Sequence, residues 1–322
     1  IVRRGYDLFH SIQYMADIIR HLPQMRGYDV VQVTNPVFFD LRPEKNWTIF
    51  KYLKKHNKKI FLDALAIDHY YVKACLDGKT FRYSDFFVGD RPLPHPEREK
   101  MLAAWIGGPN ERPNIEMAQE ANGIIACLYE YYAAYQPEYA DKLAYIPIPI
   151  DLSINPFHPI KSTPEVVKFF IGIQQHRTAI KGTDILLDVL REIHDKYPRE
   201  SHIQKVVSVP FDEYNKLLVD CHILLDQLYS YTPATNALAA MARGIIAVSG
   251  AEPEFYNFIG EQKLRPIINV LPDRNDIFKQ LENLIIHRDQ LPRLSTESRQ
   301  FVEKYHDHVK VARQYLEFWE KH

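Results

Sequence analysis

The sequence predicts an α/β fold made of two doubly wound domains. Short β-branched runs alternate with longer amphipathic runs, which is the pattern of strands that alternate with helices. The chain has 322 residues, roughly twice the length of an average domain. Five prolines fall within residues 146–164, and this stretch predicts an extended linker. We therefore expect a first domain at 1–150, a second domain at 165–297 and a terminal helix at 298–322.

The first half contains an N-terminal amphipathic helix, expected at 8–22, and four candidate strands. The segment 67–122, between the second and third strands, is rich in aromatic residues, prolines and charges. A compact domain seldom carries so long an irregular stretch without using it. The segment is therefore either a binding loop or lid, or a structural insertion that covers the sheet. The candidate strands are 29–34, 59–64, 123–127 and 143–147.

The second half repeats the alternation after the linker. A helix that begins at Thr183 has one apolar face. Residues 298–319 place aromatic and aliphatic side chains on one stripe of a long helix, which needs a surface to dock on. The other expected elements are strands at 166–172, 203–209, 222–226 and 245–249 and helices at 211–221 and 233–243.

Composition excludes several classes of function. Lysine and arginine number 40 against 41 aspartate and glutamate, so no global charge indicates nucleic acid or an anionic membrane as a partner. Cys75, Cys127 and Cys221 are far apart and lack C-x-x-C spacing, which argues against a disulfide scaffold or zinc site and favours the reducing cytoplasm. No apolar run approaches the ~20 residues that span a bilayer.

Common cofactor and catalytic motifs are missing from the sequence. Its 12 glycines form neither G-x-G-x-x-G nor G-x-x-x-x-G-K-[ST], and no G-x-S-x-G occurs. His306 and His308 are two residues apart on an expected helix, so their rings point to different faces and do not suit a metal. No D-x-D motif is present, and we expect neither a metal nor a cofactor.

Two cationic side chains follow the first strand of the second half. The strand ends at Gly172, a polar loop contains Arg177, and Lys181 precedes the helix that begins at Thr183. Doubly wound sheets bind ligands at the carboxyl ends of their strands, where a mobile ammonium and a planar guanidinium suit a diphosphate. The alternative is that Lys181 only solvates a turn.

A helix start is expected near the same strand ends. Asp226 ends a strand, and Thr232 is a candidate N-cap followed by a proline that suits the first turn. The N–H groups of Thr235 and Asn236 would then face the strand ends beside Lys181 and form an anion site. The alternative is that these polar residues only cap the helix.

Five motifs occur in succession between residues 122 and 263. They are NGIIACLYEYY, IPIPIDLSINPFHP, the strand with its cationic loop and Lys-Gly, PFDEYNKLLVDCHILLDQ, and LAAMARGIIAVSGAEPEFY. In this order they resemble family 4 glycosyltransferases, which have the GT-B fold of two Rossmann-like domains facing a cleft. The resemblance is weak before residue 120, and it implies that the terminal helix crosses back to the first domain. It also implies an opening strand and glycine-bearing loop, so we expect a βα segment to be missing upstream of Ile1.

The resemblance implies roles for individual residues. Lys181 matches the lysine that contacts the donor diphosphate, and Glu254 matches the last residue of a G-G-x-x-E turn. Ile173 stands where the family has a partner arginine, so Arg177 is the candidate substitute.

The family's paired glutamates are absent, since Tyr231 and Ala239 occupy their positions. Either other groups hold the donor or catalysis is lost. The stretch before PFDEY is also one strand and one helix shorter than in the family, so base contacts cannot be carried over and the nucleotide stays open. The candidate donor-binding residues are Arg177, Lys181, Asp226, Thr232, Thr235, Asn236 and Glu254.

The first domain is expected to present the acceptor side of the cleft. Asp68 and His69 follow a strand and could hydrogen-bond hydroxyl groups or take a proton, and with Tyr231 they are the candidate catalytic residues. Aromatic side chains beyond them either stack on sugar rings or pack over the sheet: Tyr70, Tyr71, Tyr83, Phe86, Phe87 and Trp105.

A run of lysines, KYLKKHNKKI at 51–60, precedes the second candidate strand. It could touch anionic lipid, with Arg3 and Arg4 adding to it, as expected if the acceptor is lipid-linked. The alternative is a solvated helix end.

Taken together, these features predict a glycosyltransferase that moves a sugar from a nucleotide-diphosphate sugar to a glycan or lipid-linked acceptor in surface polysaccharide synthesis. The resemblance implies retention of configuration, and the two cations can stabilise the leaving diphosphate without a metal. We expect no nucleic acid partner, and a location in the cytoplasm or at the inner face of the membrane. The alternatives are a catalytically silent binding protein or assembly subunit, and a sugar-nucleotide epimerase on the same fold.

Overall fold

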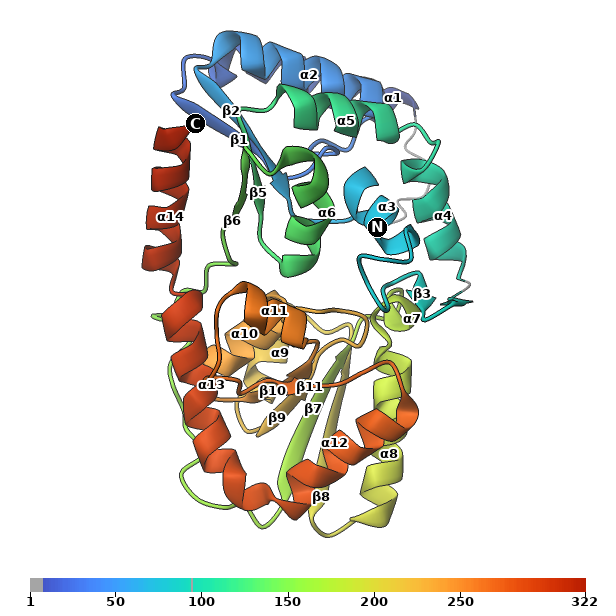
Figure 1. Ribbon diagram of the computed structural model, residues 1–322, viewed down its shortest axis with the longest axis vertical. Helices are drawn as coiled ribbons and strands as arrows, with labels where there is room; N and C mark the ends of the chain where they lie inside the picture. The colour runs from blue at the N-terminus through green and yellow to red at the C-terminus, as the bar shows by residue number, and fades with distance from the viewer. Residues whose placement is uncertain (1–7, 94) are drawn as a thin grey trace.

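The computed structural model describes residues 8–93 and 95–322 and contains two parallel sheets, one in each half of the chain (Figure 1). The first sheet has the order β1-β2-β5-β6 and the second has the order β11-β10-β9-β7-β8. This is the α/β fold with two Rossmann-like domains that the sequence predicts. The strands are β1 (Val30–Val33), β2 (Lys59–Ala64), β5 (Gly123–Ala126), β6 (Leu143–Tyr145), β7 (Val167–Ile173), β8 (Ser201–Val207), β9 (Ile223–Leu225), β10 (Ile246–Ser249) and β11 (Ile268–Asn269).

The central strands of each sheet are buried on both faces, as helices on both sides of a parallel sheet require. Phe61 and Leu62 of β2, which point to opposite faces, have no exposed surface, and neither do Phe169 and Phe170 of β7. The helices that cover the sheets are α1 (Leu8–His21), η1 (Leu22–Met25), α2 (Pro43–His56), α6 (Tyr129–Tyr139), α8 (Thr183–Lys196), α9 (Phe211–Leu218), α10 (Thr235–Ala242), α11 (Pro253–Phe258), α12 (Arg274–Ile286) and η2 (Arg288–Gln290). Within residues 8–93 and 95–322, no helix has both the length and the apolar character needed to cross a membrane.

Half of the segment 67–122 is helical, and the segment covers the first domain as a structural insertion, whereas a role as a binding loop or lid stays a prediction. Its apolar side chains form a buried cluster over the first domain that includes Tyr71 and Trp105. It also reaches the second domain, where Arg98 Nη2 donates to the carbonyl oxygen of Ala179 at 2.7 Å. Its elements are α3 (His69–Leu76), β3 (Phe87–Val88), β4 (Arg91–Pro92), α4 (Pro96–Trp105) and α5 (Glu111–Glu120).

The C-terminal region forms two helices, α13 (Leu291–Tyr305) and α14 (His308–Lys321), where the sequence predicted one. Asp307 separates them because its carboxylate accepts hydrogen bonds from the N–H groups of Val309 and Lys310, which starts a new helix. The turn lets the chain change direction between the two domains, and α14 runs beside the first sheet (Figure 1). Phe318 packs there on Phe61 with ring centroids 5.6 Å apart. The terminal helix therefore crosses back to the first domain, as expected.

Candidate functional site

A cavity of about 550 Å³ lies between the two domains, at the carboxyl ends of their strands. Loops that follow β2 and β5 and the start of α6 form its upper wall in the orientation of Figure 1. The end of β9, the end of α7 (Thr178–Lys181) with Arg177 just before it, and the start of α10 form the opposite wall. Its charged lining residues are Asp85, Glu130, Arg177, Lys181 and Asp226, and its polar lining residues include Gln227, Ser230, Thr235 and Asn236.

Lys181 and Arg177 stand at the two ends of α7 and bring positive charge to the cavity. Gly182 follows with a left-handed φ of +67°, and a Cβ at this position would lie 2.7 Å from Cβ of Leu228. The N–H of Leu228 donates to the carbonyl oxygen of Lys181 at 2.9 Å. Close packing at Gly182 therefore holds Lys181 against the loop that follows β9.

Asp226 is a buried carboxylate on the same wall as these cations, with 3% of its surface exposed. Burial raises its pKa, while the charge of Lys181 and a hydrogen bond from Asn236 oppose that change. Its Oδ1 accepts from Asn236 Nδ2 at 3.1 Å. Its Oδ2 has no hydrogen-bond partner among the described residues, and neither has the Oγ of the buried Ser230. Both atoms are themselves buried, so they do not face the open part of the cavity.

The start of α10 differs from the sequence-based expectation. The N-cap is Ala234 and the helix begins at Thr235, so Thr232 does not cap it. The reason is that Thr232 is occupied elsewhere: its hydroxyl and its N–H both donate to the carboxylate of Glu130. Thr235 and Asn236 do lie in the first turn and line the cavity, where N–H groups have no partner within a helix and favour an anion.

The first domain contributes two carboxylates that sequence reasoning did not single out. Burial raises the pKa of Asp85 to about 6, while a hydrogen bond from Tyr71 and the charges of Arg98, Arg177 and Lys181 lower it. Burial also raises the pKa of Glu130, although hydrogen bonds from the hydroxyl of Thr232 and from the backbone N–H groups of Glu130, Tyr231 and Thr232 oppose that change. Glu130 follows the strand 123–127 in the sequence, which was the available signal, whereas Asp85 is one of many polar residues in 67–122.

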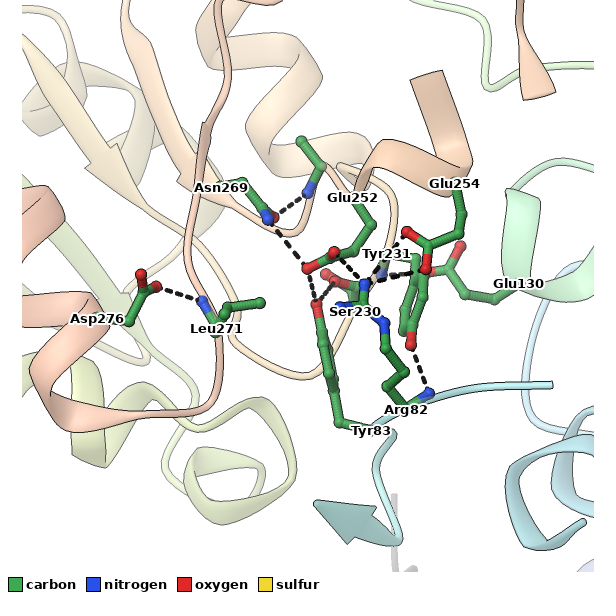
Figure 2. Close-up of polar contacts among 11 residues, drawn as sticks. Arg82, Tyr83, Glu130, Ser230, Tyr231, Glu252, Glu254, Asn269, Leu271 and Asp276 are labelled. Carbon is green, nitrogen blue, oxygen red and sulfur yellow. Dashed lines mark hydrogen bonds and ion pairs between the residues drawn. The ribbon is translucent and has the colours of Figure 1, made fainter. Parts of the chain in front are cut away.

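A second polar cluster joins the domains beside the cavity (Figure 2). The guanidinium of Arg82 is paired with the carboxylates of Glu252 and Glu254. Tyr83 donates its hydroxyl to Glu252 Oε1 at 2.6 Å. The N–H of Arg82 donates to the hydroxyl of Tyr231 at 2.6 Å. Glu254 and Tyr231 thus contact the first domain, and neither lines the cavity.

Asp68 and His69 lie outside the lining of the cavity, although the loop just before them contributes to it. Asp68 caps α3 by accepting from the N–H of Tyr71 at 2.8 Å and also accepts from the hydroxyl of Tyr135 at 2.7 Å. The Nδ1 of His69 contacts the carbonyl oxygen of Trp105 at 2.9 Å. Both side chains are buried with these partners, and a catalytic role for them stays a prediction.

The aromatic side chains of the segment 67–122 mostly pack inside the first domain. Among the six that we named, all except Phe87 are buried, and only Tyr71 lines the cavity. Packing over the sheet, rather than stacking on an open surface, is therefore their arrangement.

A smaller cavity of about 260 Å³ adjoins the main one and shares Lys181, Asp226 and Asn236 with it. The ends of β7 and β8 form its floor, and the ring of Tyr214 on α9 forms one wall. A Cβ on Gly172 would lie 2.6 Å from that ring, so glycine keeps this cavity open. The pair of cavities gives a ligand one aromatic pocket, one cationic passage and one pocket between the domains.

The lysine run lies at the end of α2 and the start of β2. Lys54 pairs with Glu120, Lys58 pairs with Asp29, and Lys59 donates to the carbonyl oxygen of Trp319 at 2.6 Å. Lys51 and Lys55 are exposed. Arg3 and Arg4, expected to add to this patch, lie outside the described residues.

Solved structures with this fold include nucleotide-sugar enzymes. HepE from Anabaena, solved in complex with UDP and glucose, is 12% identical over 95% of this chain and 81% of its own, with a TM-score of 0.58. Sucrose-phosphate synthase from Thermosynechococcus elongatus is 14% identical over 96% and 77%, with a TM-score of 0.59. WaaG, a glycosyltransferase involved in lipopolysaccharide biosynthesis, is 13% identical over 94% and 81%, with a TM-score of 0.53. No protein-family model and no curated protein sequence matches the chain. The structural likeness establishes the GT-B fold.

Proposed function

We propose that this protein is a glycosyltransferase that takes a sugar from a nucleotide-diphosphate sugar and transfers it to a hydroxyl acceptor. One observation carries the proposal. Lys181, Arg177 and the first turn of α10 converge on the cavity at the carboxyl ends of one sheet, and carboxylates of the facing domain line the other side. A donor with an anionic centre and a neutral, hydroxyl-rich end matches this distribution of charge.

The diphosphate is assigned to the passage between the two cavities, because Lys181 belongs to both. There a mobile ammonium and the N–H groups of Thr235 and Asn236 meet, and both kinds of donor favour phosphate oxygens. Arg177 adds a second positive charge at the far end of α7. The nucleoside then extends into the smaller cavity against the ring of Tyr214, and the sugar extends into the main cavity.

The reaction breaks the bond between the anomeric carbon and the diphosphate and forms a bond from that carbon to the acceptor oxygen. The electron pair of the broken bond remains on the diphosphate, where Lys181 and Arg177 stabilise the developing charge without a metal. The acceptor hydroxyl gives its proton to an oxygen of the leaving diphosphate. We propose retention of anomeric configuration, with Asp85 positioned on the first-domain wall to accept a hydrogen bond from the acceptor hydroxyl.

The acceptor in this proposal is a glycan or lipid-linked glycan of a surface polysaccharide. WaaG, one of the structures with this fold, is a glycosyltransferase involved in lipopolysaccharide biosynthesis. Lys51, Lys54, Lys55 and Lys58 of the lysine run are exposed and would face anionic lipid at the inner side of the membrane.

A catalytically silent nucleotide-sugar-binding protein is the second candidate. It is favoured by the residues at positions 231 and 239, where Tyr231 and Ala239 provide no carboxylate. Both candidates bind the donor, and only the enzyme turns it over.

Calorimetric titration of UDP, GDP and their sugar conjugates tests donor binding. We expect Lys181→Ala to weaken binding about tenfold or more, as for removal of a hydrogen bond to a charged group. The matched control is Lys279→Ala, an exposed lysine on α12 that lies away from both cavities. Binding of no nucleotide, or an unchanged affinity in Lys181→Ala, would contradict the site. Analysis of the products after incubation with the bound sugar nucleotide then separates the enzyme from the silent protein.

A further inference from the structure

We propose that Arg98, from the first domain, is the positioning residue that holds α7 and its cation Lys181 in place for the donor diphosphate. The inference rests on the proposed function, because it takes the diphosphate to lie at Lys181. It goes beyond that function by making the donor site of the second domain depend on a side chain of the first.

Arg98 is a buried guanidinium on α4 with partners from both domains. Only 5% of its surface is exposed, and among the described residues it forms no ion pair, although a buried charge usually needs one. Its Nη1 donates to the carbonyl oxygen of Leu93 at 3.2 Å, and its Nη2 donates to that of Ala179 at 2.7 Å. The guanidinium also lies over the ring of Tyr229, 5.6 Å from its centre. The carbonyl group of Ala179 and the ring of Tyr229 both belong to the second domain.

Ala179 is part of α7, the single helical turn that ends at Lys181. Figure 1 shows α7 where the segment 67–122 meets the second domain. A helix of four residues is not stable by itself, so its neighbours must hold it. The second domain holds its end through the N–H of Leu228, which binds the carbonyl oxygen of Lys181. Arg98 binds the same turn from the other domain, and a cation beside the last carbonyl groups of a helix is favourable.

Asp85 gives the positive charges around α7 a counter-charge. Burial raises the pKa of its carboxyl to about 6, while a hydrogen bond from Tyr71 and the charges of Arg98, Arg177 and Lys181 lower it. Asp85 lies on the same segment as Arg98 and lines the main cavity together with both cations of the α7 region. The first domain therefore supplies a hydrogen bond to the backbone of α7 and a carboxylate that faces its charged side chains.

Arg98→Met removes the guanidinium and keeps an unbranched apolar stem against the ring of Tyr229. The matched control is Arg82→Met, because Arg82 is also a first-domain arginine that binds the second domain. Its ion pairs are with Glu252 and Glu254, and it lines neither cavity. Comparing the two variants separates the holding of α7 from the general docking of the domains.

Titration calorimetry measures the affinity of each protein for UDP, or for GDP if the wild type prefers guanine. We expect Arg98→Met to weaken binding about fivefold or more and Arg82→Met to change it by less than about twofold. Equal losses in the two variants would show that only domain docking matters, and an unchanged affinity in Arg98→Met would show that α7 needs no support. Either result overturns the inference. A wild type that binds no nucleotide would instead overturn the proposed function, so the two failures are distinguishable.

The double variant Arg98→Met with Lys181→Ala tests whether Arg98 acts through Lys181. In the Lys181→Ala background, we expect Arg98→Met to weaken binding by less than about twofold, because the ammonium that it positions is gone. A direct attraction between Arg98 and the donor, or a general loss of structure, would weaken binding by the same factor in both backgrounds. That result would contradict a positioning role.

Hydrogen exchange in the wild type does not depend on any variant folding. The N–H groups of Lys181 and Gly182 donate within α7 to the carbonyl oxygens of Arg177 and Thr178. Because Arg98 holds α7 before a donor binds, these two amides should exchange at least about tenfold more slowly without nucleotide than in an unstructured chain. Arg98→Met should speed their exchange and leave that of α8 unchanged. Exchange at the unstructured rate in the wild type would overturn the inference.

Discussion

Arg82, on the segment that leaves the first domain, pairs with Glu252, which lies in the turn before α11 of the second domain with 1% of its surface exposed. The pair does not stand alone, because Glu252 also accepts hydrogen bonds from Tyr83 at 2.6 Å and from Asn269 at 3.0 Å. The guanidinium lies over the ring of Tyr231, 5.7 Å from its centre. This cluster anchors the two domains to each other beside the cavity (Figure 2).

Replacing Arg82 by methionine should destabilise the protein, because it leaves the carboxylate of Glu252 buried without a positive charge. The side chain of Arg82 is 55% exposed, so we expect a loss of about 1–2 kcal/mol, below the 3–5 kcal/mol typical of a fully buried pair. Urea unfolding measures the loss. Glu254→Gln is the control, since it removes only the more exposed partner and should change stability by less than about 1 kcal/mol.

The double variant Arg82→Met with Glu252→Gln should be less destabilised than the sum of its two single variants, because no charge remains buried. If the loss of stability in the double variant equals the sum of the losses in the two single variants, the pair does not couple the domains.

Gly250 should tolerate no side chain. A Cβ at this position would lie 1.7 Å from the carbonyl oxygen of Ser230, and neither atom can rotate away because both are bound to backbone. Gly250→Ala should therefore lower the free energy of unfolding by about 3 kcal/mol or more, at the upper end for overpacking. The control is Gly260→Ala, where nothing lies within 4 Å and only the left-handed φ of +69° opposes a side chain.

The control at Gly260 should cost about 1–2 kcal/mol, the usual penalty for a left-handed residue with a Cβ. Chemical denaturation compares the two variants. Equal losses in both would mean that the loop at Ser230 and the turn at Gly250 are not in close contact.

Asp63 should make the stability of the protein depend on pH. Burial raises its pKa to about 7, and only the hydrogen bond from Gln32 opposes that change. A carboxyl group with a higher pKa in the folded state binds more protons when folded, so stability is present at low pH and is lost as the pH rises toward about 7. Between pH 5 and pH 8 this group should remove about 2–3 kcal/mol.

Asp63→Asn should abolish that contribution, because the amide has the same shape and does not ionise. Urea unfolding at pH 5 and pH 8 measures the difference for wild type and variant. Other buried carboxylates such as Asp85 titrate in the same range and remain in both proteins, so the comparison isolates Asp63. Identical pH dependence in the two proteins would contradict a raised pKa at this position.

The sequence alone was sufficient to predict the strands, most of the helices and the residues that form the cationic wall of the cavity. Each strand expected from a β-branched run is present, with ends within about two residues of the expectation, as in β2 at Lys59–Ala64. Arg177, Lys181 and Asp226, predicted to bind the donor, all line the cavity, and their contact with a donor stays a prediction. They could be found because parallel strands of one sheet bring their carboxyl ends to the same edge, so each residue needed only its own strand to be recognised.

The start of α10 and the break between α13 and α14 show where local reasoning failed. Thr232 has the composition of an N-cap, yet its hydroxyl is bound by a residue of the other domain, and the helix begins three residues later. Asp307 interrupts an apolar stripe that looks continuous in the sequence. In both places a side-chain hydrogen bond determines where the helix begins, and the pattern of apolar residues in the sequence does not show it.

By itself the sequence determined the alternation of strands and helices, the two sheets and the cationic wall, because periodicity, propensity and strand ends depend on neighbours in the chain. Tertiary structure decided which residues face that wall. Glu130 meets Tyr231 across 101 positions of sequence, and the pairing of Arg82 with Glu252 spans 170. Such contacts follow from how one domain is placed on the other, and this placement depends on packing over the whole interface. It produces no periodic pattern in the sequence near either residue.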